Sequence, residues 1–469
     1  MLKHLITIVL IAILFFSAQA QPLLEENELV EAKEYNSIED AMSDPDNVYK
    51  LNLGHLGLKE IPESVFQLKK LQILDLWNND IAQIPERINE LPNLQFLNIS
   101  GNKLKAFPPE LSELKYLVMI EAEENQLEYI PNSICTLKEL ESLNISNNRL
   151  NTLPSNIGEL EALVNLNVSH NQLRMLPASF GNLSNLQSVN LSENRLKELP
   201  PEISQLKNVK IFDIKSNELL ELPDEISQLT QIPYLNISNN ELRNLPPNIG
   251  QLDMMLMLDL SKNQLSLLPD QIGKLTSLYE LNLAENKLVQ LNPEIGKLEN
   301  LQILILRKNV LRELPFEIGN MSSLEQLDVS SNILLELSPR VGELERLKEF
   351  DLYNNQLREI PNTIGELENL EELNISYNSL SSLPSQIGNL SKLKKLDCSY
   401  NQLSSVPVEL GNLSDLEGLN MNNNKLTILP PSIENFKKLQ YIYLKNNDFT
   451  EESLNYIKSL LSDFIKLRY

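Results

Sequence analysis

Apolar residues recur along this chain in a pattern that repeats every 23 residues. Residues 137–159 form one such unit, which reads LxxLxxLxLxxNxLxxLPxxIGx. A fixed period of this length is typical of a solenoid, in which each turn packs only on its two neighbours. The asparagine of the pattern occurs 17 times without insertion or deletion, as Asn79, Asn102, Asn125, Asn148, Asn171, Asn194, Asn217, Asn240, Asn263, Asn286, Asn309, Asn332, Asn355, Asn378, Asn401, Asn424 and Asn447.

Each unit contains the signal of a short strand followed by a return segment. Leu143 and Ile145 alternate with polar neighbours, which is the two-residue period of a strand with one buried face. Leu150, Leu153 and Ile157 then turn the chain back. One unit buries about seven or eight apolar side chains at roughly 1.5–3 kcal/mol each, whereas ordering its backbone costs roughly 1–2 kcal/mol per residue. A single unit therefore cannot fold alone, and stacked units must share one core.

The repeat resembles the leucine-rich repeat family, whose signature is LxxLxLxxN/CxL. The resemblance covers residues 51–449. It implies an α/β solenoid, a leucine-rich repeat horseshoe with a curved parallel sheet on its concave face and helical caps. It also implies that the repeated asparagines form a buried ladder that bonds the backbone of adjacent turns. The units are similar to those of bacterial secreted members of the family and to the repeats of its Ras-scaffold type.

The first 20 residues depart from the repeat. Lys3, an apolar stretch over residues 5–16 and an A-x-A site at residues 18–20 together predict a cleaved signal peptide. An uncleaved anchor is the alternative. A cleaved signal peptide implies that the protein is secreted or periplasmic and carries no membrane-inserted segment after cleavage.

The two ends of the mature chain are predicted to be helical caps over the open core. Residues 21–47 form the first, with Ser37 as a helix N-cap, and residues 450–469 form the second, which begins at Thr450. Between them, residues 48–449 comprise one degenerate unit plus 17 regular units. The apolar stripe of the last helix is predicted to contain Leu454, Ile457, Leu460, Leu461 and Phe464. Two altered Leu-Pro steps, at Asn292-Pro293 and Ser338-Pro339, are expected to dent the convex wall.

Composition narrows the function. The formal net charge of −24 argues against binding to nucleic acid and to anionic membranes, which require basic surfaces. Cys135 and Cys398 lie 11 units apart and cannot form a disulfide. The three histidines are scattered, and the chain contains no HExxH, nucleophile elbow, phosphate loop or cysteine cluster. The sequence therefore predicts a protein that is not an enzyme and needs no cofactor or metal.

Candidate binding residues are those that the predicted strands turn outward. The central outward position is almost always Asp or Asn, a stripe that could suit a polar or cationic ligand or could simply keep the sheet solvated. Three patches interrupt it, and exposed aromatic clusters are typical anchors of interfaces. The first contains Trp77 and Phe96, with Ile73 and Met119; the second contains Tyr234 and Met257, with Ile211 and the nearby basic pair Arg307 and Lys308; the third contains Tyr353, Tyr377, Tyr400, Tyr441 and Tyr443.

These features predict an exported recognition protein, expected to be a monomer, that binds a protein or glycan partner through its concave face. One alternative is a structural or adhesive surface protein that acts by self-association. Another is an intracellular signalling scaffold, which requires that residues 1–20 stay attached.

Overall fold

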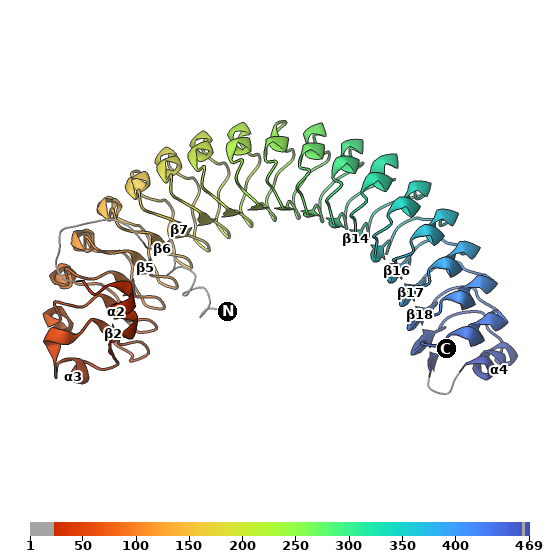
Figure 1. Cartoon of the computed structure of the whole chain (residues 1–469), viewed down its shortest axis with the longest axis horizontal. Coiled ribbons are helices and arrows are strands. Elements are labelled where there is room, and N and C mark those ends of the chain that lie inside the picture. The colour runs from red at the N-terminus through yellow and green to blue at the C-terminus, as the bar shows by residue number, and fades with distance from the viewer. Residues whose placement is uncertain (1–22, 462–464) are drawn as a thin grey trace.

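The computed structural model describes residues 23–461 and 465–469. The chain winds into an open arch with all its strands on the inner face and its short helices on the outer face (Figure 1). The N-terminal turns, in red, and the C-terminal turns, in blue, form the two ends of the arch. The fold class predicted from the repeat, a leucine-rich repeat horseshoe, is confirmed.

The inner face is one parallel sheet in which every strand pairs with the strand one turn away. Successive partners are 23 residues apart, as where Tyr234 pairs with Ile211 on one side and with Met257 on the other. The 20 strands of the described residues are β1 (Glu34–Tyr35), β2 (Lys50–Asn52), β3 (Ile73–Asp75), β4 (Phe96–Asn98), β5 (Met119–Glu121), β6 (Ser142–Asn144), β7 (Asn165–Asn167), β8 (Ser188–Asn190), β9 (Ile211–Asp213), β10 (Tyr234–Asn236), β11 (Met257–Asp259), β12 (Glu280–Asn282), β13 (Ile303–Ile305), β14 (Gln326–Asp328), β15 (Glu349–Asp351), β16 (Glu372–Asn374), β17 (Lys395–Asp397), β18 (Gly418–Asn420), β19 (Tyr441–Tyr443) and β20 (Lys466–Arg468).

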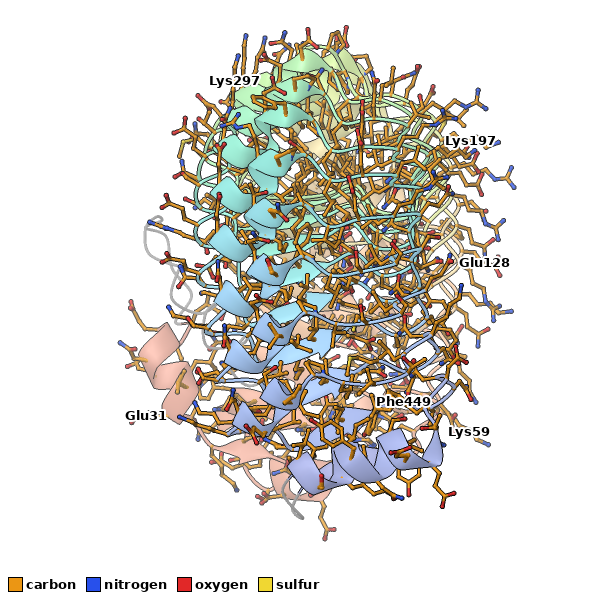
Figure 2. The ribbon with its side chains drawn as sticks, turned by 90° about the vertical axis from the view of Figure 1, so that its right-hand side faces the viewer. Glu31, Lys59, Glu128, Lys197, Lys297 and Phe449 are labelled. Carbon is orange, nitrogen blue, oxygen red and sulfur yellow. The ribbon has the colours of Figure 1, made fainter. Side chains whose placement is uncertain are left out.

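The outer face consists of 3₁₀ helices, most of which begin directly after the proline of the Leu-Pro step. This proline is the N-cap of the helix, with extended backbone at φ between −58° and −72°, which is the φ that its ring imposes. These helices form a column along one side of the arch, and the loops carrying Lys59, Glu128 and Lys197 lie on the other side (Figure 2). They are η2 (Pro45–Asn47), η3 (Glu63–Gln67), η4 (Glu86–Glu90), η5 (Pro109–Glu113), η6 (Asn132–Thr136), η7 (Ile157–Glu159), η8 (Ala178–Asn182), η9 (Pro201–Gln205), η10 (Asp224–Gln228), η11 (Ile249–Gln251), η12 (Asp270–Lys274), η13 (Pro293–Lys297), η14 (Phe316–Asn320), η15 (Pro339–Glu343), η16 (Asn362–Glu366), η17 (Ser385–Asn389), η18 (Val408–Asn412) and η19 (Pro431–Asn435).

The core runs continuously between the two faces and is filled by the repeated apolar residues. Leu143, Ile145 and Leu150 of one unit are almost completely buried, as are their equivalents in the other regular units except Phe449 of the last, which is partly buried. Cys135 and Cys398 are buried free thiols within this core. The packing leaves the outward strand positions, the loops and the outer faces of the 3₁₀ helices available for contact with another molecule; Phe316 of η14 and Val408 of η18, for example, are exposed.

The repeated asparagines form the ladder that the resemblance implies. The Asn240 Nδ2 donates hydrogen bonds to the carbonyl oxygens of Ile214, Ile237 and Ser238 at 3.0, 3.1 and 3.2 Å. Its Oδ1 accepts one from the backbone N–H of Leu219 at 3.1 Å. The amide thus satisfies inward-facing backbone groups that no strand or helix pairs.

One turn residue before each ladder asparagine adopts the left-handed conformation. Sixteen such positions from Asn78 to Asn446 carry a side chain at φ between 52° and 56°, and Gly101 occupies the remaining one at 65°. His55, which precedes Leu56 of the degenerate unit, adopts the same conformation at 60°. Asparagine tolerates this region better than most residues. The conformation follows from the tight turn at the end of each strand and places side chains on the rim of the sheet.

Short helices and additional strands close the two ends. The first end contains α2 (Glu26–Glu31) and α3 (Ile38–Ala41), and the Ser37 Oγ accepts a hydrogen bond from the backbone N–H of Asp40 at 3.1 Å, as expected of an N-cap. The second contains α4 (Glu451–Leu460), which the Thr450 side chain caps in the same way. At the two edges of the sheet, β1 pairs with β2 and β20 pairs with β19. Strands therefore extend the sheet within the two end segments, for which only helices were predicted.

Of three predictions about the chain ends, two concern residues outside the described part of the chain and one differs from the structure. The predicted signal peptide, residues 1–20, lies outside them, as does Phe464. Helix α4 ends at Leu460, so Leu461 packs against the core from beyond the helix rather than within its stripe. Within residues 23–461 and 465–469, no helix is both long and apolar enough to cross a membrane.

Candidate functional site

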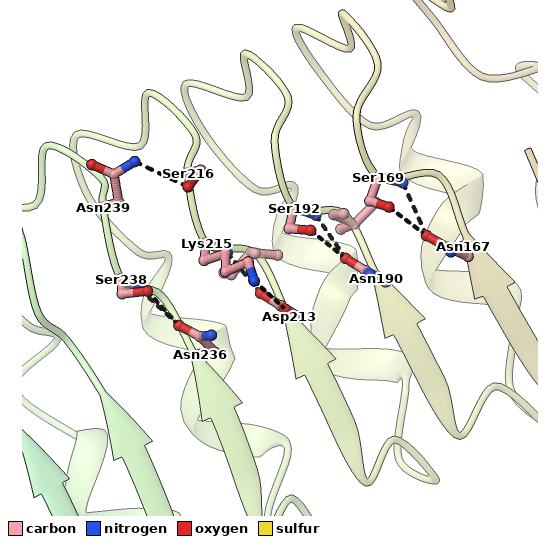
Figure 3. Close-up of polar contacts among 12 residues, drawn as sticks. Asn167, Ser169, Asn190, Ser192, Asp213, Lys215, Ser216, Asn236, Ser238 and Asn239 are labelled. Carbon is pink, nitrogen blue, oxygen red and sulfur yellow. Dashed lines mark hydrogen bonds and ion pairs between the residues drawn. The ribbon is translucent and has the colours of Figure 1, made fainter. Parts of the chain in front are cut away.

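The polar stripe along the concave face is part of the turn that ends each strand. The Asn190 Oδ1 accepts hydrogen bonds from the backbone N–H and the Oγ of Ser192, at 3.0 and 2.7 Å. The Asp213 Oδ1 accepts one from the N–H of Lys215 at 3.0 Å, and further strands repeat the contact (Figure 3). Such a side chain bonds its own backbone two residues on and fixes the turn. One polar atom of each such side chain is therefore committed to the fold. In places the second is bonded as well, since the Asn420 Nδ2 donates to the Asp397 Oδ2 and the Asn144 Nδ2 donates to Glu121, both at 2.8 Å.

Glu121, Ile305 and Tyr443 interrupt this stripe. Glu121 is mostly buried, and its carboxylate accepts a hydrogen bond from the Asn144 Nδ2 at 2.8 Å. Burial raises the pKa of Glu121 to about 7; the bond from Asn144 opposes the rise, and the neighbouring Glu123 adds to it. A glutamate is one methylene too long to reproduce the turn contact, so this unit lacks it.

The central patch contains more exposed apolar surface than the sequence suggested. Ile211, Tyr234 and Met257 lie side by side on β9, β10 and β11 and are 51%, 43% and 37% exposed. Leu256 and Tyr279, which directly precede β11 and β12, are also exposed and lie on turns joined by a 2.8 Å bond from the Tyr279 N–H to the Leu256 carbonyl. We call these five residues the central apolar patch. Continuous exposed apolar surface of this kind marks interaction sites.

The N-terminal patch is also brought together. Ile73, Phe96 and Met119 are partners on β3, β4 and β5. Trp77 lies beyond the end of β3, with its ring 3.8 Å from that of His55 in an edge-on arrangement. Its indole occupies the space in which a side chain at Gly54 would stand.

The predicted basic pair is not a free basic site. Lys308 lies in the left-handed turn on the rim, and its Nζ forms an ion pair with Glu285 at 3.1 Å. Arg307 is exposed next to it. The neighbouring glutamate neutralises half of the predicted pair, and the pair lies beyond the strand rather than on the sheet.

The five tyrosines form two separate groups rather than one cluster. Tyr377 and Tyr400 occupy left-handed turn positions and stack with ring centroids 3.9 Å apart, and Tyr353 meets Tyr377 edge-on at 5.1 Å. These three are the rim tyrosines. Tyr441 and Tyr443 instead point outward from β19 and stack on each other at 4.9 Å.

Sequence reasoning missed the residues that make room for these aromatic rings. A side chain at Gly418 would collide with the ring of Tyr441, one repeat later, just as one at Gly54 would collide with Trp77. Subtracting 23 from the number of each outward aromatic residue would have found both glycines. Leu256 and Tyr279 were missed because they precede the strands by one residue.

The described residues also lack the geometry of a metal site. Within them, no group of three or more histidine, cysteine, aspartate or glutamate side chains converges as a metal site would require. The histidines His55 and His170 both lie in left-handed turns of different units.

Comparison with known families and structures agrees with this geometry. Models described as leucine-rich repeat region and leucine-rich repeat match residues 285–397, 46–104, 184–242, 391–449, 139–160 and 162–183. The structure of a leucine-rich repeat protein of Leptospira interrogans is 33% identical, covering 93% of this chain and all of that one, with a TM-score of 0.68. The chain belongs to the leucine-rich repeat family.

Other similar leucine-rich repeat structures include a receptor ectodomain with its ligand. The ectodomain of the Arabidopsis receptor kinase HAESA, in complex with a peptide hormone, is 29% identical over 89% of this chain and 72% of its own, with a TM-score of 0.66. YopM of Yersinia enterocolitica is 25% identical over 96% of both chains, with a TM-score of 0.62. No curated protein sequence matches the chain. Leucine-rich repeat structures similar to this one therefore include ligand-binding ectodomains.

Proposed function

We propose that this leucine-rich repeat protein is exported and binds a protein ligand through its concave face, with the central apolar patch as the anchor. The observation that carries the proposal is the row formed by Ile211, Tyr234 and Met257, which are large, exposed and adjacent. Burying such side chains contributes roughly 1.5–3 kcal/mol each. Anchors of this kind, surrounded by polar residues, supply most of the affinity of protein interfaces.

The neighbouring turns favour a polypeptide over a sugar as the ligand. Leu256 and Tyr279 widen the patch with an aliphatic and an aromatic side chain. Aliphatic surface gains affinity from apolar side chains of a ligand, which a polypeptide offers and a polar glycan offers sparingly. The peptide complex of the similar HAESA ectodomain supports this choice.

The repeat supplies its own replacements for a test. The strand position of Ile211, Tyr234 and Met257 is occupied by serine in β6 and β8, so three serines there are compatible with the fold. We expect this variant to keep its circular dichroism spectrum and to lose the ligand that the native protein captures from its surroundings. The matched control replaces Ile73, Phe96 and Met119, at the same strand position, with serine.

The outcome separates the patches. Capture that survives the central change but not the N-terminal change would move the site to β3–β5. Capture that survives both would refute the anchor. Concentration-dependent oligomers in sedimentation would instead support self-association.

Export is tested separately by the N-terminus of the mature protein. Cleavage after the A-x-A site predicts a chain that begins at Gln21. A mature chain that begins at Met1 would contradict export and would favour the intracellular scaffold.

A further inference from the structure

A groove crosses the C-terminal part of the concave face, over strands β14 to β19. Its volume is about 630 Å³, and its floor is made by outward side chains of the sheet. Six of the fifteen lining residues are charged: Asp328, Glu349, Asp351, Glu372 and Asp397 are acidic, and Lys395 is basic. We call the groove with these six residues the acidic trough. Lys395 forms a 2.5 Å ion pair with Glu372, which leaves four carboxylates without a cation among the lining residues.

The aspartates of the trough are held in fixed positions. The Oδ1 atoms of Asp328, Asp351 and Asp397 accept hydrogen bonds from backbone N–H groups two residues on, at 3.0, 2.8 and 2.9 Å. These are the turn contacts described above, so each side chain is locked before any ligand arrives. A ligand loses little affinity to side-chain ordering at a site that is already ordered.

The aspartates also interact with one another through space. Burial raises the pKa of Asp351, and the charges of Asp328 and Asp397 add to the rise, while hydrogen bonds from the Tyr353 N–H and the Asn374 side chain oppose it. The negative charge of Asp351 is therefore partly desolvated and is repelled by its two aspartate neighbours. A cationic group placed there would relieve both effects.

The spacing of the charges favours an extended cation over a single ion. Neighbouring strands of a sheet are about 4.8 Å apart, and the five carboxylates are spread over the four strands β14 to β17, which gives a row rather than a cage. Within residues 23–461 and 465–469, no three of these groups converge as metal ligands. Six strands span about 24 Å, which matches about seven residues of extended polypeptide.

An aromatic wall closes the end of the trough and already carries a guanidinium group. Tyr441 and Tyr443 line this end. The guanidinium of Arg468, from the last strand, lies over the Tyr443 ring at 5.3 Å from its centroid. Guanidinium groups stack on tyrosine faces, so this wall suits the side chains that the carboxylates would attract. The tyrosine wall and the carboxylate floor thus favour the same chemistry.

We propose that the acidic trough binds a basic segment of the protein ligand, an extended stretch that carries arginine side chains. The inference rests on the proposed function, because it assigns a second contact on the same face and names its chemistry. The proposal depends on charge complementarity. The lining contains five carboxylates and one ammonium, that of Lys395, which is already paired with Glu372.

The probe is an eight-residue peptide of alternating arginine and glycine with blocked ends, titrated into the mature protein in a calorimeter. We expect it to bind in about 50 mM salt, where charges are weakly screened, and to weaken as salt is added. A glutamate–glycine peptide of the same length should not bind. A lysine–glycine peptide should bind more weakly than the arginine peptide, because the ammonium stacks less well on the tyrosine wall.

Asparagine substitutions remove the charge without removing the turn. Asn374 and Asn420 occupy the same strand position as the trough aspartates and make the same turn contact. Replacing Asp328, Asp351 and Asp397 together with asparagine should weaken the arginine peptide about tenfold or more. The matched control replaces Asp75, Asp213 and Asp259, which hold the same position and the same contact on β3, β9 and β11. It removes the same charge and should change the affinity less than about twofold.

Each outcome of the peptide titrations and of the capture experiment either supports or overturns one of the two proposed contacts. Equal weakening by the two triple variants would mean that overall acidity attracts the peptide, and would overturn the assignment. An arginine peptide that does not bind the native protein would overturn it as well. If the peptide fails while the central patch still captures its ligand, only the trough is wrong. If the peptide binds as expected while the serine variant of the central patch keeps its ligand, only the anchor is wrong.

Discussion

Replacing Asn240 with alanine tests the physical basis of the whole arch. Asn240 is 7% exposed and makes four hydrogen bonds to backbone groups. Two of its acceptors have another ladder asparagine as a donor: the Ile214 carbonyl accepts from Asn217 at 3.1 Å, and the Ile237 carbonyl from Asn263 at 3.0 Å. These carbonyls stay bonded when Asn240 is removed.

The backbone N–H of Leu219 has no such second partner. It donates to the Asn240 Oδ1, and Leu219 is completely buried. A buried donor left without a partner costs about 1–3 kcal/mol. We therefore expect Asn240→Ala to lower the free energy of unfolding by this amount, mostly through one stranded N–H group. The hydrogen bonds that Asn217 and Asn263 still donate to the Ile214 and Ile237 carbonyls limit the loss of stability.

The assay must detect a local effect in a long solenoid. Urea denaturation followed by circular dichroism gives the overall loss, and hydrogen exchange of the peptide containing Leu219 reports the turn itself, because solenoid turns can open separately. Asn151→Ala is the control: Asn151 is exposed and its side chain makes one 3.4 Å bond, to the Arg149 carbonyl. It should change stability by less than about 0.5 kcal/mol. Equal, small losses from both variants, with unchanged exchange at Leu219, would refute the ladder argument.

Further predictions concern positions at which the repeat is broken. Glu121→Asn should stabilise the protein, because asparagine restores the turn contact and removes a carboxyl whose pKa is raised to about 7. A raised carboxyl pKa lowers stability as pH rises from about 4.5 to about 7, so urea denaturation should show a gain that grows over this range to about 1–3 kcal/mol and then levels off. Gly418→Ser should displace the ring of Tyr441 and change the near-ultraviolet dichroism of tyrosine, while the far-ultraviolet spectrum stays the same. Cys135 and Cys398 are both buried and free, and burial raises the pKa of each thiol, so a thiol reagent should react with neither until denaturant is added.

The regular part of the fold could be predicted from the sequence because every signal is repeated. A single Leu-x-Ile strand signal is weak, but 17 in phase leave one architecture that satisfies all of them. The burial of Leu143 and Ile145 and the bonds of Asn240 agree with that prediction. The additional strands β1 and β20 could not be predicted, because each pairs only where the sheet offers a free edge.

Local deviations were predicted less well. The altered steps at Pro293 and Pro339 were expected to dent the outer wall, but η13 and η15 have the same five-residue length as most others. Asn292 and Ser338 cap these helices by accepting hydrogen bonds from backbone N–H groups two residues on, so the altered step is compensated. The shortened helices are instead η7 and η11, which follow ordinary Leu-Pro steps.

The site was only partly predictable, because outward residues were assigned by alternation alone. Alternation places Tyr234, Met257, Tyr441 and Tyr443 correctly on the strands. It fails three residues beyond the strand, where the backbone turns left-handed and carries Tyr377 to the rim. Stacking between rings and the space supplied by glycine depend on the neighbouring turn, which a single unit does not describe.

The tyrosine of the trough wall shows how a solenoid can change one surface position without weakening the turn beneath it. At Tyr443 the usual Asp or Asn is missing, so the N–H two residues on, that of Lys445, loses its normal acceptor. Asn422 of the preceding turn replaces that acceptor, with its Oδ1 2.7 Å from the Lys445 nitrogen. Because an unpaired backbone donor would cost about 1–3 kcal/mol, this replacement makes the tyrosine structurally tolerable. A residue that breaks the repeat, has its lost bond replaced by the turn before it and faces an acidic groove is better explained by binding than by drift in the repeat.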